Sequence, residues 1–241
     1  MLIVKFALIY ILISSGIIYL SRYLGYFDKP NKRGIHKIPT INTGGLIIYF
    51  VFLALVSQTE LNHNIELIVS IGFFVCLTGF VDDRINLNPS NKILLIIIPS
   101  IYLILKGVSI SDLGQYEYIG KLELGKFEIP FLLLAVGLLI NATNYIDGID
   151  GLLLTFFSSC LTYYIFLIDD TKTVNLLKFF LAVSILNLIL NLLPTKNKFK
   201  IFNGDSGSLF IGFFISFVTI ELYNSFKIHP VILIWPLWYP V

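Results

Sequence analysis

Residues Asn141–Leu152 read N-A-T-N-Y-I-D-G-I-D-G-L and place two carboxylates, two amides and two glycines within twelve residues. The stretch lies between two long apolar runs, Ile129–Ile140 and Leu152–Ile168. Its polar groups are therefore expected at the mouth of a hydrophobic body, and the rest of the chain is interpreted outward from them.

Three polar side chains in this stretch are spaced three residues apart. Asn144, Asp147 and Asp150 would project from one face if the stretch forms a helical turn. Gly148 and Gly151 lack a β-carbon, which lets a bulky ligand approach the backbone. Crowded carboxylates repel one another unless a cation or protonation relieves them. Because hard cations share oxygen ligands with phosphates, the pattern predicts a magnesium-dependent site for a phosphorylated substrate.

The composition excludes a soluble protein. Of the 241 residues, 56% are hydrophobic and 13% are charged, whereas soluble domains are about 25% charged. Repeated apolar runs of roughly 20 residues predict an all-α polytopic membrane protein with a single transmembrane domain over residues 1–241. The chain has no Lys/Arg-rich tract with interleaved aromatics, so no nucleic-acid partner is expected. Cys76 and Cys160 lie in apolar runs and are expected to be packed thiols.

About nine transmembrane helices are expected, although several of the runs are shorter than roughly 20 residues. After the fourth run, the alternating K-L-E-L-G-K-F-E-I around Gly125 predicts a small external β-hairpin within Ser109–Pro130. The first run continues past its small residues without a cleavage pattern, which favours a retained span over a signal peptide. The nine runs are Leu2–Tyr23, Gly44–Gln58, Ile65–Val81, Ile93–Val108, Ile129–Ala142, Leu152–Ile168, Val174–Leu193, Ser206–Tyr223 and Ile228–Val241.

Four connections are separated from one another by pairs of crossings and so face the same side of the membrane. Together with Arg22 at the end of the first run, they hold ten of the 17 Lys and Arg residues, most densely in the first connection. The positive-inside rule therefore predicts that this side is the cytoplasm and that the N-terminus lies outside. The four connections are Leu24–Thr43, Asp82–Lys92, Thr143–Gly151 and Pro194–Asp205.

Two further polar clusters follow or precede apolar runs on this side. Asp82-Asp83-Arg84 is either a helix end capped by charge or a metal or base site, in which neighbouring carboxylates raise one pKa. In the stretch F-N-G-D-S-G-S-L at 202–209, the start of a span offers backbone N–H groups to an anion, with Ser206 or Ser208 as a cap. A plain N-cap is the simpler interpretation of this second cluster. The presence of three acidic clusters on one side favours function.

The first connection is basic and ends in Gly44-Gly45. Anchoring by the positive-inside rule is sufficient for most of its lysines. Lys37, near the two glycines, is a candidate for phosphate binding, and His36 lies beside it as a second candidate.

These motifs together resemble the polyprenyl-phosphate N-acetylhexosamine-1-phosphate transferases of glycosyltransferase family 4, which are related to phospho-N-acetylmuramoyl-pentapeptide transferase. The resemblance rests on N-x-x-N-x-x-D-G-x-D-G-L, the Asp-Asp pair after the third run, G-D-x-G-S-L before the eighth, and H-x-x-P-T followed by Gly-Gly. It implies transfer of a sugar 1-phosphate from a UDP-sugar to polyprenyl (undecaprenyl) phosphate with release of UMP. It further implies Mg²⁺, with Mn²⁺ as a substitute, in the bacterial plasma membrane, at the first membrane step of cell-wall or surface-polysaccharide assembly.

By motif position, the resemblance implies that Asn144 and Asp205 hold the metal. It implies that Asp82 and Asp83 lie by the acceptor phosphate, one of them as a base.

For the donor, it implies that Asp147, Gly148 and Asp150 line the uridine-diphosphate site. Phe202 occupies the place of an aromatic residue that can stack on uracil.

The chain departs from the family pattern in two places. Ile41 and Asn42 follow Pro39-Thr40, where relatives often have proline and a basic residue. The last apolar run ends at Val241 after about 14 residues, too few to span, and a histidine-rich loop of the family does not follow, so a C-terminally truncated chain is expected. The alternatives left open are a secondary transporter, a catalytically inactive scaffold and, for assembly, a homodimer.

Overall fold

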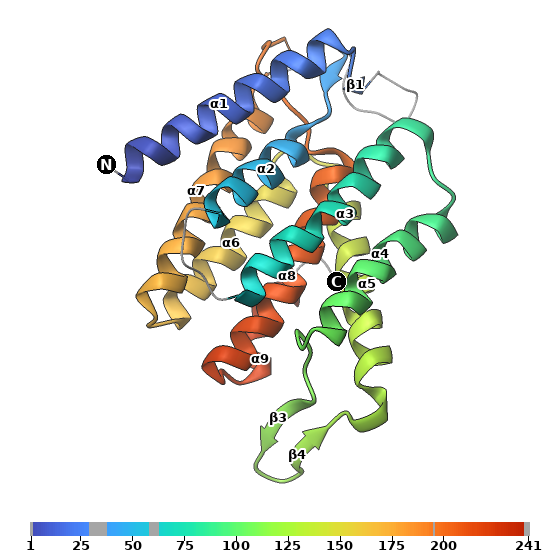
Figure 1. Cartoon of the computed structure of the whole chain (residues 1–241), viewed down its shortest axis with the longest axis vertical. Coiled ribbons are helices and arrows are strands. Elements are labelled where there is room, and N and C mark those ends of the chain that lie inside the picture. The colour runs from blue at the N-terminus through green and yellow to red at the C-terminus, as the bar shows by residue number, and fades with distance from the viewer. Residues whose placement is uncertain (1, 29–37, 58–62, 195, 239–241) are drawn as a thin grey trace.

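The computed structural model describes residues 2–28, 38–57, 63–194 and 196–238, which fold into helices with two small two-stranded sheets (Figure 1). The long helices are α1 (Leu2–Tyr23), α2 (Gly44–Val56), α3 (His63–Ile85), α4 (Pro89–Leu105), α5 (Glu128–Ile146), α6 (Leu152–Leu167), α7 (Thr171–Leu192) and α8 (Gly204–Phe226). The short elements are β1 (Phe27–Asp28), β2 (Thr40–Ile41), β3 (Asp112–Tyr116), β4 (Gly120–Glu123), the 3-10 helices η1 (Gly125–Phe127) and η2 (Trp235–Trp238), and α9 (Pro230–Ile234).

Five helical segments in the described part of the chain are long and apolar enough to cross a membrane. Helices α2, α4 and α6 are apolar but shorter, at 13, 17 and 16 residues. The expected all-α polytopic membrane protein is therefore confirmed. The last apolar run does not form the expected span, because its described part forms the five-residue α9 followed by η2. The expected connection Asp82–Lys92 is also shorter than predicted, since α3 continues to Ile85 and α4 begins at Pro89. The five segments are Lys5–Tyr23, His63–Ile85, Gly125–Ile146, Thr171–Leu192 and Gly204–Phe226.

Helix α8 lies in the middle of the bundle, packed against α2, α3 and α5 (Figure 1). Glycines permit this packing at two points. A β-carbon on Gly45 of α2 would lie 2.0 Å from the backbone nitrogen of Gly207, and one on Gly79 of α3 would lie 2.2 Å from the carbonyl oxygen of Asp205. The backbones of α2 and α3 therefore touch the first turns of α8 directly, which fixes where α8 begins.

Aromatic rings fill the space between α2, α7 and α8. Phe52 stacks on Phe180 with ring centroids 4.0 Å apart, and Phe214 lies 5.2 Å from Phe52. All three side chains are fully buried. Rings of this size dominate the buried contact area of a core, so they hold the middle of α8 while the glycines hold its beginning.

A β-hairpin lies at one end of the bundle (Figure 1), where β3 pairs with β4 in antiparallel register. The expected hairpin is confirmed, but its turn lies at 117–119, and Gly125 instead begins η1. The Tyr223 hydroxyl at the end of α8 donates a hydrogen bond to Asp112, which holds the pKa of that carboxyl below its usual range. The hairpin is thereby tied to the end of α8.

The four connections expected to share one side meet at the other end of the bundle. Strand β1 pairs with β2, and Ile41 of β2 forms a parallel bridge with Ile201, just before α8. The Gly44 backbone N–H donates to the carbonyl of Phe202 at 2.8 Å, and that of Gly45 to the carbonyl of Asn203 at 2.9 Å. These contacts bring the first and last of the four connections together.

Candidate active site

Asp83 of α3 closes the N-terminus of α8. Its Oδ1 accepts hydrogen bonds from the Asp205 backbone N–H at 3.1 Å and from the Asn42 amide at 3.0 Å. The expectation that Ser206 or Ser208 caps this helix is wrong, because the Ser206 hydroxyl donates to the Asn203 carbonyl at 3.3 Å and that of Ser208 to the Asp205 carbonyl. The cap comes from another helix and could not be read from local sequence.

Gly204 makes room for this arrangement. Its φ of +70° is in the left-handed region, and a β-carbon would lie 2.5 Å from Asn42 Oδ1 and 2.6 Å from Asp83 Oδ2. A side chain at this position would therefore be strained and would also collide with two polar groups of the site. Asn42, one of the two residues that depart from the family pattern, thus has a definite contact.

Lys92 joins two of the acidic clusters, and sequence reasoning assigned it no role in the site. Its ammonium Nζ lies 2.7 Å from Asp82 Oδ2 and 2.7 Å from Asp205 Oδ2. The Asn88 side chain caps the start of α4 by accepting from the Ser90 N–H at 3.1 Å, which places Lys92 in the first turns of α4. A lysine just inside a helix that follows an Asp-Asp pair was the available signal.

Asn144 of α5 extends this group to a fourth helix. Its Nδ2 donates to Asp205 Oδ1 at 2.9 Å and to the Ser208 hydroxyl at 2.8 Å. The neighbouring Thr143 hydroxyl donates to the Ser208 carbonyl at 3.0 Å, which fixes α5 against α8. The structure therefore places Asn144 and Asp205 side by side, as their expected common role requires.

Asp147 and Asp150 do not share a helical face, contrary to expectation. Helix α5 ends at Ile146, and residues 147–151 form a turn. Asp147 accepts a hydrogen bond from the Asn203 amide at 2.7 Å, whereas Asp150 accepts one from the Lys200 ammonium at 2.7 Å. The two carboxylates therefore bind different parts of the connection before α8.

The two glycines of this turn have different roles. A β-carbon on Gly148 would have no closer neighbour than the Tyr145 carbonyl at 3.6 Å, so this exposed position leaves free space. Gly151 has a φ of +77° at the N-cap of α6, and a β-carbon there would lie 2.7 Å from Leu192. Its role is conformational, because the turn requires a left-handed residue packed against α7.

Phe202 lies beside the Asp150–Lys200 pair. Its ring is partly exposed, and the Lys200 ammonium lies 5.3 Å from the ring centroid. Its backbone N–H donates to the Ile41 carbonyl at 2.8 Å, which fixes the residue against β2. The other expected substrate contacts, His36 and Lys37, lie outside the described residues.

The electrostatics of the turn favour a protonated Asp147. Burial, assisted by the like charges of Asp205 and Asp83, raises the pKa of Asp147 to about 8, although the Asn203 hydrogen bond lowers it. A cation or a bound positive group near this carboxyl would stabilise its charged form.

The polar groups of the site are of the chemical type that binds a hard divalent cation. Within the described ranges, no three acidic, histidine or cysteine side chains are grouped as a metal site. Asp82 and Asp205 nevertheless already hold a cation, the Lys92 ammonium, between them. Two buried oxygens beside the start of α8, Asp83 Oδ2 and Asn203 Oδ1, have no hydrogen-bond partner among the described residues. Oxygen-rich surroundings with spare acceptors suit Mg²⁺ or Mn²⁺.

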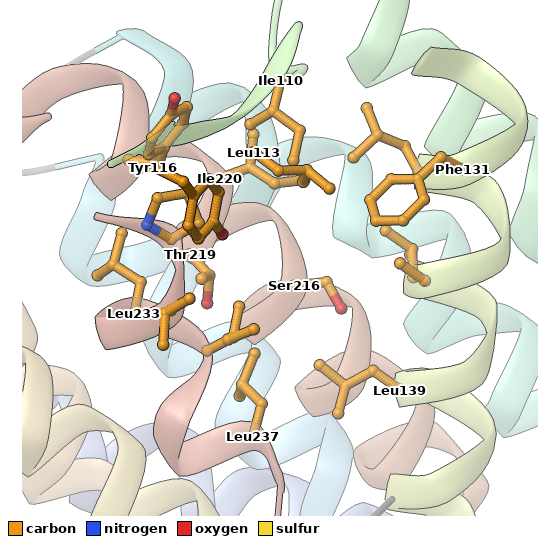
Figure 2. Close-up of a pocket in the computed structure, with 17 residues that line it drawn as sticks. Ile110, Leu113, Tyr116, Phe131, Leu139, Ser216, Thr219, Ile220, Leu233 and Leu237 are labelled. Carbon is orange, nitrogen blue, oxygen red and sulfur yellow. The ribbon is translucent and has the colours of Figure 1, made fainter. Parts of the chain in front are cut away.

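An apolar cavity of about 310 Å³ lies at the hairpin end, between β3, α5, α8 and α9 (Figure 2). Leu113, Phe131, Ile220 and Leu233 are among its walls. The described residues that line it include no charged side chain. A phosphorylated ligand would lose its solvation there without compensation, so this cavity is not the site of the polar chemistry.

Fold and polar groups together define an integral membrane protein whose carboxylates and amides, carried by α3, α5 and α8, gather at one end of the helical bundle. The chain belongs to glycosyl transferase family 4, whose model matches residues 65–223. The matched segment contains Asp82, Asp83, Lys92, Asn144 and Asp205.

Curated relatives agree with the family. The chain is 30% identical over 226 residues to the undecaprenyl-phosphate alpha-N-acetylglucosaminyl 1-phosphate transferase of Escherichia coli K12, covering 90% of this chain and 60% of that protein. It is 28% identical over 216 residues to the probable undecaprenyl-phosphate N-acetylglucosaminyl 1-phosphate transferase of Bacillus subtilis, covering 87% of this chain and 59% of that protein. The chain thus spans about 60% of the length of these relatives.

Proposed function

We propose that this chain carries the catalytic centre of a membrane transferase that moves an N-acetylhexosamine 1-phosphate from a UDP-sugar to polyprenyl phosphate and releases UMP. The observation that carries the proposal is the convergence of Asp83, Asn144 and Lys92 on Asp205. Asp82 joins them through the same Lys92 ammonium. The names of the relatives support the reaction class. Phosphoryl transfer depends mainly on positioning and on neutralising charge, which such a group of residues can supply.

The acceptor would bind at Asp82 and Asp83. Both lie near the end of α3, where a lipid phosphate can approach from the bilayer while its chain stays in the apolar phase. Asp83 is fixed by Asn42 and by the α8 backbone and keeps one oxygen free of hydrogen bonds within the described chain. We assign Asp83 the role of receiving the acceptor's proton or of a further metal contact, and Lys92 the role of balancing phosphate charge.

The metal would be Mg²⁺, with Mn²⁺ as a substitute, held by Asn144 and Asp205. Such an ion would supply positive charge to neutralise the negative charge that develops on the phosphate groups during transfer. The hydrogen bond that the Asn144 amide donates to the Ser208 hydroxyl, and the one that the Thr143 hydroxyl donates to the Ser208 carbonyl, hold Asn144 against the first turns of α8, beside Asp205. Hydrogen-bond partners of this kind orient metal ligands.

The donor would bind around the turn that follows α5. Asp147 and Asp150 would contact the nucleotide, exposed Gly148 leaves space beside them, and the Phe202 ring would stack on uracil. The Asp150–Lys200 pair lies at the edge of that ring.

His36 and Lys37 remain predicted contacts to the substrate phosphates. The proposed setting is the bacterial plasma membrane, with this end of the bundle in the cytoplasm, where nucleotide sugars are made, and the N-terminus outside. A homodimer stays a prediction.

Transfer is tested by UMP release and lipid-linked sugar phosphate formation in membranes that contain the protein, a labelled UDP-sugar and polyprenyl phosphate. We expect Asp205→Ala to lower the rate about 100-fold, the upper end for losing a metal-site contact. Lys172→Gln, at the far end of α7, is the matched control and should keep the rate. Full activity in Asp205→Ala would overturn the metal assignment, and solute flux in proteoliposomes without sugar transfer would favour a transporter.

A further inference from the structure

A polar cavity of about 170 Å³ lies at the same end of the bundle as the carboxylates, but its charged lining residues are cationic. It is formed by the end of α1, by β1 and β2, and by the connection between α7 and α8. Its cationic side chains are Arg22, Lys196, Lys198 and Lys200, and the described residues that line it include no Asp or Glu. We call it the basic cavity.

Backbone contacts fix the shape of the basic cavity. The Arg22 guanidinium donates a hydrogen bond to the Lys198 carbonyl, which joins α1 to the connection before α8. The Ile41–Ile201 bridge joins β2 to the same connection. The cavity is therefore a built feature of three chain segments.

Two of the four cations already have partners, and two are available. Lys200 is buried and donates to Asp150 and to the Asn191 carbonyl, so its ammonium is committed to the carboxylate side. Lys196 and Lys198 are exposed, and the described residues give neither a salt bridge, although the Lys198 ammonium lies 5.0 Å from the Phe199 ring. Asp150, the partner of Lys200, and Asp28 of β1, which follows the lining residue Phe27, are not in the lining of the cavity.

Helix α1 indicates how deep the basic cavity lies relative to the bilayer. Arg22 lies in the last turn of the candidate span Lys5–Tyr23. Tyr19 and Tyr23 on the same turns are 73% and 78% exposed, as expected of aromatic side chains at a membrane–water interface. The cations therefore lie at the level of lipid headgroups.

We propose that the basic cavity binds the phosphate group of an anionic phospholipid, with Lys196 and Lys198 as the principal contacts. A phosphate oxygen anion matches a concave, cationic site that lacks acidic lining, and a headgroup reaches this depth without leaving the bilayer. The basic cavity is distinct from the proposed transfer site, which lies on the other side of Lys200 and Phe202. Its occupant would anchor the connection that carries Asn203 and the start of α8.

The test is retention of phosphatidylglycerol by the purified protein in mixed micelles of phosphatidylglycerol and phosphatidylcholine, measured by native mass spectrometry without donor or acceptor substrates. Lys196→Gln/Lys198→Gln removes the two available charges from exposed positions. Lys172→Gln/Lys178→Gln, two exposed lysines on α7 away from the cavity, is the matched control. We expect the first variant to retain phosphatidylglycerol about tenfold less well than wild type and the control to match wild type.

Equal retention by all three proteins would overturn the proposal. A thermal melt of each variant checks folding, and if the first variant proves unstable, Lys198→Gln alone replaces it. Inorganic phosphate and glycerol 1-phosphate, added as soluble competitors, separate the two sources of phosphate. Weak competition supports the lipid, and full competition with no preference for phosphatidylglycerol over phosphatidylcholine overturns it in favour of a free phosphate.

Discussion

The carboxylate of Asp83 accepts a hydrogen bond from the backbone N–H of Asp205, so α3 caps α8 across 122 positions of sequence. A carboxylate at a helix N-terminus also meets the positive end of the helix dipole. Asp83 therefore makes a structural contact through its Oδ1, while its Oδ2 is available for chemistry.

These two roles of Asp83 can be separated by substitution. Asp83→Ala removes the cap and should cost about 1 kcal/mol of stability, the usual value for an N-cap. Asp83→Asn keeps a cap acceptor and should keep most of that stability while losing transfer activity. Thermal melts in detergent and UMP release measure the two effects. An active Asp83→Asn would show that the carboxylate charge is not required.

Lys92→Met should make the site depend on an added cation for stability. The substitution leaves Asp82 and Asp205 facing each other without the ammonium, at a cost on the order of 2 kcal/mol for a partly exposed ion pair. A divalent cation would take over the neutralising role. The measurement is the melting temperature with EDTA and with Mg²⁺. We expect Mg²⁺ to raise it more in the variant than in wild type, and an equal response would argue against cation binding here.

The ionisation of Asp147 makes the free energy of unfolding depend on pH. Its pKa rises from 3.8 to about 8 on folding, so this contribution is complete below about pH 4 and is lost as the pH rises towards about 8. Asp147→Asn removes the titration. Melting temperatures in EDTA from about pH 5 to pH 9 should therefore fall less steeply for the variant than for wild type. Parallel slopes would contradict the raised pKa.

The glycine contacts of α8 predict a strong and local sensitivity to one methyl group. Gly79→Ala should cost about 2–3 kcal/mol, the upper part of the overpacking range, and should reduce transfer because it displaces Asp205. Gly137→Ala in α5 is the control, since a β-carbon there meets nothing within 4 Å and alanine should gain about 0.5–1 kcal/mol in a helix. Similar melting temperatures for the two variants would refute the close packing.

Hydrophobic periodicity and apolar length were sufficient to predict most of the membrane architecture. The first run, Leu2–Tyr23, has the bounds of α1, and the sixth, Leu152–Ile168, differs from α6 by one residue. Crossing parity also grouped the acidic connections correctly at one end, because each long apolar run must enter and leave the bilayer.

The pairing within the site could not be predicted in the same way. The site forms only when three helices pack and bring together Lys92, Asp82 and Asp205. Nothing in the local sequence around these residues indicates that they are in contact. The end of α5 at Ile146 was missed for a related reason, since a spacing of three residues indicates one helical face only while the helix continues. Asp147 and Asp150 instead take partners from the connection before α8.

The central position of α8 has a consequence for biosynthesis. Chains emerge from the ribosome N-terminus first, so α2, α3 and α5 enter the bilayer before the helix that they enclose has been translated. During that interval Gly45 and Gly79 have no α8 backbone against them, and Asp82 and Asp83 lack Asp205 as a neighbour. Assembly of the acidic end is therefore a late event, completed only when α8 inserts between helices made earlier.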